Sequence, residues 1–418
     1  MTTRRLLLLG GLATLRPVID TARSVGCHVV TADYLPDNPA HRLADEYQFA
    51  SVTDAEAVER VAREIEADGI LSFGVDPGVA TAAVVAERLG LPFQGSAEAV
   101  GILQEKSRFR KFLADNGFNT PRFREFIVEP DDDEALAKTV EMAKDIAAAW
   151  QRDDCWPVIV KPVDNAGSKG VSRVDDPGQL PEAFKEAALN SRCRKVIMEQ
   201  FIIPEGHPSD SDCFSVGGRL VSVSFSDQHF DASATNPYTP SAFDWPSTMP
   251  MWAQEQLRRE LQRLCSLLRL RDGIYNVETR LGRDGKTYIM EFSPRGGGNR
   301  YAEVLDRLAG TNLVADTVRA SLGMELLPLG DPEYKGFPSL IVIHSDREGR
   351  FAGIEMDDEL REAVVETELR VSPGDKIYPF TGANRALGTL ILHFDSREAQ
   401  KRIVNDIGRH LKVRRLKT

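Results

Sequence analysis

The sequence has few cysteines and no long hydrophobic run, and each shortage excludes a class of protein. Its five cysteines among 418 residues are scattered and form no C-x-x-C pair, so neither a disulfide framework nor a zinc site is expected. The apolar run after Arg4-Arg5 ends at Gly10-Gly11. It is too short to cross a membrane, and no small-residue cleavage site follows it. We therefore predict a cytoplasmic protein in which this run forms a buried strand.

The chain also has fewer basic residues than acidic ones. The chain has 52 Lys and Arg residues against 63 Asp and Glu residues, which gives a net charge of −11. A protein that binds the nucleic-acid backbone in general needs a basic face, so neither nucleic acid nor a membrane is expected as a partner. A basic pocket confined to one site remains compatible with this charge.

A complete dinucleotide-binding fingerprint is missing as well. Residues 1–35 read as strand, glycine turn, helix and strand, and Asp33 lies 22 residues after Gly11. However, the chain has Gly10-Gly11-Leu-Ala-Thr-Leu where the fingerprint needs G-x-G-x-x-G. Further strand and helix signals up to Phe93 predict a doubly wound α/β domain. An NAD(P)-dependent oxidoreductase that uses this domain remains an alternative.

What the sequence does contain is a pair of acids in a predicted β-hairpin. Two β-prone runs between Gly273 and Ser293 flank Asp284-Gly285, a preferred two-residue type I′ turn. This turn sets Glu278 opposite Glu291, with their Cβ atoms about 4.5–5.5 Å apart on one face. Facing carboxylates repel unless a cation lies between them, and Mg²⁺ or Mn²⁺ is the natural candidate. A solvated hairpin with two scattered acids is the alternative.

A lysine and a glycine-containing loop form a second motif. Lys161 lies near the end of a predicted buried strand, residues 156–163. The loop that follows consists of Gly167, Ser168, Lys169 and Gly170. Backbone N–H groups in such a loop can face phosphate oxygens, although no Walker A sequence is present. A flexible hairpin with a lysine at its base is the alternative.

Two further segments could contact a ligand. An apolar strand that begins at Lys195 ends in Glu199, Gln200, Phe201 and Ile202. Its free backbone groups could pair with a purine edge, although by itself it is only a buried strand. The loop after Glu291 carries Arg295, Gly297, Gly298 and Asn299. A guanidinium suits a carboxylate or phosphate, and glycines let the backbone approach a ligand. The alternative is a loop with a surface arginine.

Together with Lys106, which precedes this central region, the ordered motifs resemble the ATP-grasp superfamily. More narrowly, they are similar to its carboxylate–amine ligase branch, which includes L-amino acid ligases and glycinamide ribonucleotide synthetase-like proteins. The resemblance covers nearly the whole chain. It implies a Rossmann-like domain at residues 1–105 and a two-part ATP-grasp module at 106–325, with a lid at about 121–200. A small α+β domain at 326–418 would follow.

The resemblance also implies roles for the motif residues. Lys106 and Lys161 would contact the nucleotide phosphates under the Gly167–Gly170 lid. Adenine would lie against Glu199 and the backbone through Ile202. Glu278 and Glu291 would hold two Mg²⁺ ions between them, and Arg295 would bind the acyl phosphate.

The chain departs from the family pattern at two places. Ser293 stands where the family commonly has an asparagine metal ligand, and Asn276, predicted opposite Ser293, could compensate. The acid that contacts the ribose is not identified either, because Glu205, Asp210 and Asp212 are all candidates.

The implied activity is an ATP-dependent ligase. It would activate a small carboxylate, such as an amino acid, as an acyl phosphate and join it to an amine, with release of ADP and phosphate. Small molecules would be its partners, and a homodimer is one option for its assembly. A non-catalytic ATP-binding module is another alternative.

Residues 203–213 and 227–250 are predicted to be long loops, and such loops are often functional. We place acceptor specificity in residues 226–245. The candidates there are Asp227, His229, Asp231, Tyr238 and Trp245. Among them, His229 could take a proton from the attacking ammonium.

Overall fold

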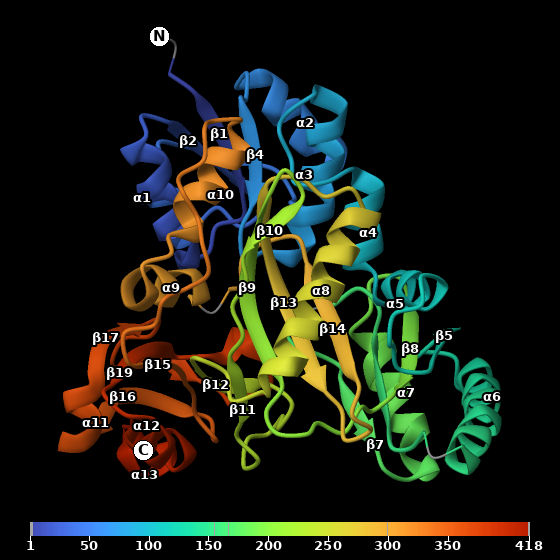
Figure 1. Cartoon of the computed structure of the whole chain (residues 1–418). Coiled ribbons are helices and arrows are strands. Elements are labelled where there is room, and N and C mark those ends of the chain that lie inside the picture. The colour runs from blue at the N-terminus through green and yellow to red at the C-terminus, as the bar shows by residue number, and fades with distance from the viewer. Residues whose placement is uncertain (1–2, 154, 166, 299, 417–418) are drawn as a thin grey trace.

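The computed structural model describes residues 3–153, 155–165, 167–298 and 300–416. A parallel sheet of order β3-β2-β1-β4 lies at the top of Figure 1, and its strands span Glu46–Phe49, His28–Asp33, Arg5–Leu9 and Gly69–Ser72. The helices around it are α1 (Arg16–Ser24), α2 (Ala55–Glu64), α3 (Asp76–Leu89) and α10 (Leu313–Ser321). Leu7 and Leu9 of β1 pack with α2 and α3, whereas Leu6 and Leu8 pack with α1 and α10. The predicted doubly wound domain is confirmed, because both faces of its central strand are covered.

A second sheet, of order β5-β8-β6-β7, lies at the lower right of Figure 1. Its strands span Phe123–Ile127, Lys195–Gln200, Val158–Pro162 and Ser172–Val174. Two helices, α6 (Asp133–Arg152) and α7 (Leu180–Leu189), bury their apolar residues against it. Strand β6 carries Lys161 and β8 ends at Gln200, so two of the sequence motifs lie on neighbouring strands.

The third sheet contains the predicted hairpin. Its order is β10-β9-β13-β14, and the strands span Arg219–Ser222, Ser209–Val216, Gly273–Leu281 and Thr287–Ser293. Helix α8 (Met251–Leu267) packs a stripe of leucines, including Leu257, Leu261 and Leu264, into the core of this sheet. Helices α4 (Ala97–Gln104) and α5 (Lys106–Asp115) add to the same core.

The C-terminal region, at the lower left of Figure 1, holds two sheets. The order β11-β12-β15-β19-β17 joins Asp227–Phe230, Pro240–Asp244, Phe337–Ile343, Gly388–Phe394 and Val364–Leu369. The order β18-β16-β20 joins Lys376–Ile377, Gly349–Met356 and Leu411–Arg415. The helices of this region are α9 (Tyr301–Ala309), α11 (Asp358–Ala363), α12 (Arg397–Asn405) and α13 (Ile407–His410).

Several predicted elements differ from the structure. The predicted loops contain β9, β11 and β12, and β9 lies at the centre of its sheet, paired with β13. Its run Ser209-Asp-Ser-Asp212 lacks apolar alternation, and the carboxyls of Asp210 and Asp212 accept hydrogen bonds from Asn276 of the neighbouring strand. Residues 91–93, where the predicted strand and helix signals of the N-terminal domain end, form no strand.

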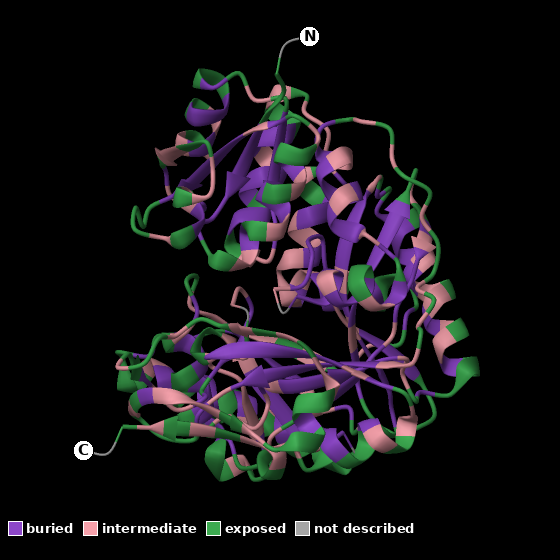
Figure 2. Ribbon diagram, turned by 90° about the vertical axis from the view of Figure 1, so that its left-hand side faces the viewer, coloured by how far each residue is buried: buried purple, intermediate pink, exposed green. Residues whose placement is uncertain are grey.

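Burial follows the sheets. In Figure 2 the strands are largely buried, and exposed residues lie mainly on helices and loops. Among the described residues, no helix is long and apolar enough to cross a membrane.

Candidate active site

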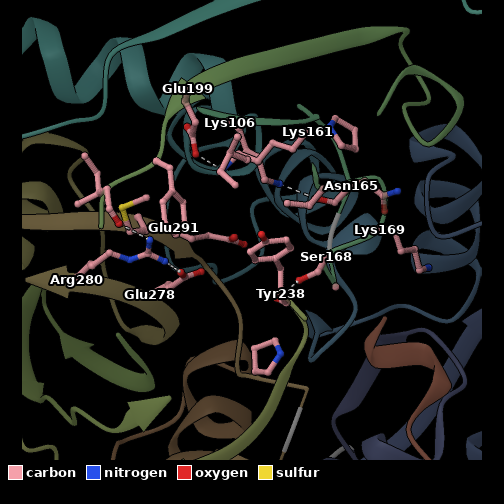
Figure 3. Close-up of a pocket in the computed structure, with 18 of the residues that line it drawn as sticks. Lys106, Lys161, Asn165, Ser168, Lys169, Glu199, Tyr238, Glu278, Arg280 and Glu291 are labelled. Carbon is pink, nitrogen blue, oxygen red and sulfur yellow. Dashed lines mark hydrogen bonds and ion pairs between the residues drawn. The ribbon is translucent and has the colours of Figure 1, made fainter. Parts of the chain in front are cut away.

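One cavity brings the sequence motifs together. The sheet with β6 and β8 forms one wall, and the β13–β14 hairpin forms the other (Figure 3). The residues predicted to bind the nucleotide and the metal that line it are Lys106, Lys161, Gly167, Ser168, Lys169, Glu199, Gln200, Phe201, Ile202, Glu278 and Glu291. Motifs separated by up to 185 positions, from Lys106 to Glu291, therefore surround a single space.

The hairpin pairs Glu278 with Glu291 as predicted, although its turn differs from the prediction. Gly282 N–H donates to the Lys286 carbonyl at 2.8 Å, so the loop has one residue more than the predicted turn. Gly285 has a positive φ of 75°, whereas a type I′ turn needs positive φ at Asp284 too. An unpaired Met290, a β-bulge, then restores the register. The pairing is correct because these two deviations cancel.

Arg280 balances part of the charge on the glutamate pair. It follows Glu278 by two positions on the same face of β13, and its Nη2 lies 3.3 Å from Glu278 Oε1. Its Nη1 donates to the carbonyl of Ile202 at 2.8 Å, which joins the hairpin to the end of β8. Arg280 was not predicted from the sequence, although its two-residue spacing from Glu278 was a usable signal.

Lys161 is held by a buried acid. Glu199 is 1% exposed, and its Oε1 accepts from Lys161 while its Oε2 accepts from Arg110 at 2.9 Å. Burial opposes ionisation of Glu199, but Arg110 and Lys161 outweigh it and lower the pKa of Glu199 to about 2. Burial lowers the pKa of Lys161, and Glu199 partly offsets that shift. The carboxylate predicted to contact adenine is thus bound to two cations, and Arg110 was missed although it lies one helical turn after Lys106.

Lys106 contacts the segment that leads into the glycine loop. Lys106, the first residue of α5, donates from Nζ to the carbonyl of Asn165 at 2.6 Å. Gly167, Ser168 and Gly170 all have φ between 59° and 69°. Gly170 stands outside the described lining of the cavity. A side chain there would collide with Asn190, because an added Cβ would lie 2.7 Å from the Cβ of Asn190.

Arg295 and Ser293 lie in a buried network instead of on the described cavity wall. Arg295 is 7% exposed and donates from Nε and Nη2 to both carboxylate oxygens of Asp76, at 2.8 Å each. Its Nη1 donates to Asn276 Oδ1 at 3.1 Å. Ser293 Oγ donates to Asp76 at 3.1 Å and accepts from Gln104 at 2.9 Å. The structure therefore places both residues against the N-terminal region.

The candidate ribose acids on β9 belong to the same network. Asn276 Nδ2 donates to Asp210 at 2.8 Å and to Asp212 at 3.2 Å. Tyr301 donates to Asp210, and the N–H of Gly297 donates to Asp212, both at 2.9 Å. Burial raises the pKa of Asp212 to about 7 and raises the pKa of Asp210 well above its usual range. The third candidate, Glu205, is exposed.

The predicted acceptor residues are dispersed. Only Tyr238 lines the described part of the cavity. His229 lies between two lining residues of β11, and its Nε2 lies 2.8 Å from Asp244 Oδ2. Asp227 accepts hydrogen bonds from Ser247 and Thr248, Asp231 pairs with His344, and Trp245 is fully buried.

The glycines predicted to contact the substrate lie elsewhere. Gly297 and Gly298 line a second, smaller hollow with Phe73, Gly74 and Arg300. Asn299 lies outside the described residues.

Two family models match separate parts of the chain. Residues 155–303 match the ATP-grasp domain, and residues 341–414 match L-amino acid ligase C-terminal domain 2. Among curated proteins, formate-dependent phosphoribosylglycinamide formyltransferase from Synechococcus sp. (strain WH7803) is 32% identical over 207 residues. That match covers 48% of this chain and 49% of the relative, so the chain matches only about half the length of this relative.

Solved structures show the same fold along the whole chain. L-amino acid ligase from Bacillus licheniformis superposes with a TM-score of 0.77 at 20% identity and covers 100% of both chains. Carboxyaminoimidazole ribonucleotide synthase from Aspergillus clavatus, complexed with ATP, has a TM-score of 0.71 at 18% identity and covers 97% of this chain and 98% of its own. The expected resemblance is therefore confirmed: the chain contains an ATP-grasp domain followed by a domain of the L-amino acid ligase C-terminal type.

Proposed function

We propose that this protein is an ATP-dependent carboxylate–amine ligase. It activates a small carboxylate, such as an amino acid, as an acyl phosphate and joins it to an amine, releasing ADP and phosphate. The observation that carries the proposal is the Glu278–Glu291 pair, which faces a cavity that also holds Lys106 and Lys161. The family matches and the shared fold support this reaction class. They do not favour the NAD(P)-dependent alternative.

The chain divides, in this proposal, into residues 1–105, 106–325 with the lid at about 121–200, and 326–418. A strand pairing crosses the last boundary. Strand β12 pairs with β15 of the C-terminal sheet, so residues 227–244 connect the ATP-grasp module to the C-terminal domain.

The glutamate pair suits magnesium at a nucleotide. No group of three or more His, Cys, Asp or Glu residues that could hold a metal occurs within the described ranges. Mg²⁺ is usually bound by one or two carboxylates together with substrate phosphates and water, and Glu278 with Glu291 supplies that number. Bound there, the metal would offset phosphate charge while a carboxylate approaches. Ser293 and Asn276 have other partners, so we assign no metal contact to them.

The cations of the cavity would hold the phosphates. Glu199 fixes Lys161, and the Asn165 carbonyl fixes Lys106, so both ammonium groups are positioned before a ligand arrives. Such positioning carries most of phosphoryl transfer, in which the protein does little covalent chemistry. Because the Glu199 carboxylate is engaged, we assign adenine to the part of the cavity beside the end of β8, with Phe201 against the ring.

The proposed reaction has two bond exchanges. A carboxylate oxygen attacks the γ-phosphorus while the bond to ADP breaks, and then the amine nitrogen attacks the acyl carbon while phosphate leaves and the nitrogen loses a proton. We assign no proton transfer to His229, because Asp244 binds it on the other side of β11. Arg295 acts in this proposal through Asn276, by holding the hairpin.

A screen of ADP and phosphate release tests the proposal. Amino acids and small carboxylates are offered singly and in pairs with ATP and Mg²⁺. Release that requires two components supports ligation, whereas release without either component indicates simple ATP hydrolysis. Binding of ATP by calorimetry without release for any pair would support the non-catalytic alternative. Fluorescence titration with NADH tests the oxidoreductase alternative directly.

A further inference from the structure

One asparagine side chain joins the glycine loop of the cavity to the C-terminal region. Asn236 lies between β11 and β12, inside the segment 226–245 predicted to set acceptor specificity, but it is not one of the candidate residues named there. Its Nδ2 donates to the carbonyl of Ser168 in the glycine loop at 3.0 Å and to the carbonyl of Thr381 at 3.2 Å. Its Oδ1 accepts from the N–H of Tyr238 at 3.0 Å. The two amide hydrogens therefore bind two segments that are far apart in the sequence.

Other contacts hold the same three segments together. Asn236 N–H donates to the carbonyl of Phe380 at 3.2 Å, and Ser168 Oγ donates to the carbonyl of Tyr238 at 3.0 Å. The turn and the loop also touch directly, because a Cβ added to Gly382 would lie 3.1 Å from the Gly167 carbonyl. The glycine loop thus packs against residues 236–238 and 380–383.

Ser168 needs such external support. It is a non-glycine residue with φ of 59°, a left-handed conformation that persists only where surrounding contacts favour it. Asn236 binds the carbonyl of this same residue, and Tyr238 accepts from its hydroxyl. Without these bonds, the loop would more readily leave the position in which it lines the cavity.

We infer that Asn236 is a positioning residue that ties the glycine loop, residues 167–170, to the C-terminal turn, residues 380–383. The position of the loop over the cavity then depends on the position of the C-terminal turn, and the reverse also holds. The consequence for ATP rests on the proposed function, whereas the mechanical link does not.

Two substitutions separate the bridge from a purely local role. Asn236→Ala removes all three side-chain hydrogen bonds, whereas Asn236→Asp keeps the acceptor for Tyr238 N–H but has no hydrogen to donate. If the bridge matters, both variants raise the KM for ATP on the order of tenfold, while kcat at saturating ATP changes little. Asn116→Ala is the control, because Asn116 is exposed and its side chain bonds only within its own helix end. An Asn236→Asp enzyme with wild-type KM would overturn the inference.

Hydrogen exchange tests the link without any nucleotide. In the intact folded protein, Asn236→Ala should speed exchange of backbone amides both in residues 167–170 and in residues 380–385. Faster exchange confined to residues 236–239, or no change, would overturn the inference. The wild type could fail to bind ATP while Asn236→Ala still speeds exchange in both segments. In that case the proposed function fails and the link between the segments stands.

Discussion

Two neighbouring pairs on one face of the β13–β14 hairpin have opposite environments. Glu278 and Glu291 line the cavity, and the Glu278 side chain remains 30% exposed. Asn276 and Ser293, the next pair on that face, belong to a network in which Ser293 is 1% exposed. The two pairs share their strands, register and direction, so local structure does not explain the difference.

The difference comes from what covers each pair. The N-terminal region places Asp76, at the start of α3, over the second pair, where it binds both Arg295 and Ser293. Above the first pair lies the cavity, which separates the hairpin from the sheet that contains β6 and β8. One hairpin thus supplies a candidate site and a structural joint, and the element packed above decides which is which.

The largest expected effect is on activity. Glu291→Gln should lower ADP release by at least about 100-fold, because a neutral amide binds Mg²⁺ and offsets its charge less well than a carboxylate. The measurement is ADP release with the best substrate pair from the screen. Glu255→Gln, a change of an exposed acid in α8, is the control. Activity of Glu291→Gln within twofold of the wild type would show that the Glu278–Glu291 pair is not part of an active site.

A large effect on stability is expected at the covered pair. Asp76→Ala leaves the guanidinium of Arg295 buried without its ionic partner, which should lower the free energy of unfolding by about 3–5 kcal/mol. Urea denaturation measures this change. Glu278→Gln is the matched substitution at the open pair and should cost less than about 1 kcal/mol. Equal losses for the two variants would contradict the contrast between the pairs.

The network should also respond to pH. Burial raises the pKa of Asp212 in the folded protein to about 7, above its value of about 3.9 in an unfolded chain. The folded state therefore keeps the proton to a higher pH than the unfolded chain does. As pH rises from about 4 to 7, Asp212 contributes progressively less to the free energy of unfolding. The loss is at most about 1.4 kcal/mol per pH unit.

Asp212→Asn isolates this effect, because its side chain does not titrate. Urea denaturation at several pH values should show the stability of the wild type falling relative to the variant across that interval. Parallel pH curves for the two proteins would show that Asp212 titrates normally.

The smallest effect distinguishes a structural from a metal-binding role for Ser293. Ser293→Ala removes its bonds to Asp76 and Gln104 and should cost about 1 kcal/mol of stability. The Mg²⁺ concentration that gives half-maximal activity should not change. A tenfold rise in that concentration would instead place Ser293 among the metal ligands.

The sequence predicted those elements whose secondary structure depends on the pattern of a few neighbouring residues. The continuous apolar run of β1, for example, indicated a buried strand. Strand β9 escaped prediction because its buried polar residues depend on distant partners. Asp212, for example, is fully buried and accepts from the N–H of Gly297, which follows it by 85 positions.

The candidate site shows the same division. Lys161, Glu199 and the glutamate pair were found from strand ends and hairpin pairing. The engagement of Glu199 by Arg110, and of Arg295 by Asp76, could not be predicted, because each contact joins elements that only the folded chain brings together. The position of His229 was also beyond the pattern, since β11 was not recognised as a strand.

The sequence by itself determined that Glu278 and Glu291 lie on two strands joined at Asp284-Gly285, because two β-prone runs flank a residue pair that favours a turn. Their facing positions also required a longer loop and a bulge at Met290, whose effects cancel. Only the tertiary structure decided that this pair meets a cavity while Asn276 and Ser293 meet an ion pair. The physical reason is that burial depends on packing between elements, and Asp76 lies 219 positions from Arg295. Local periodicity extends over a strand or a helix and contains no information about such a contact.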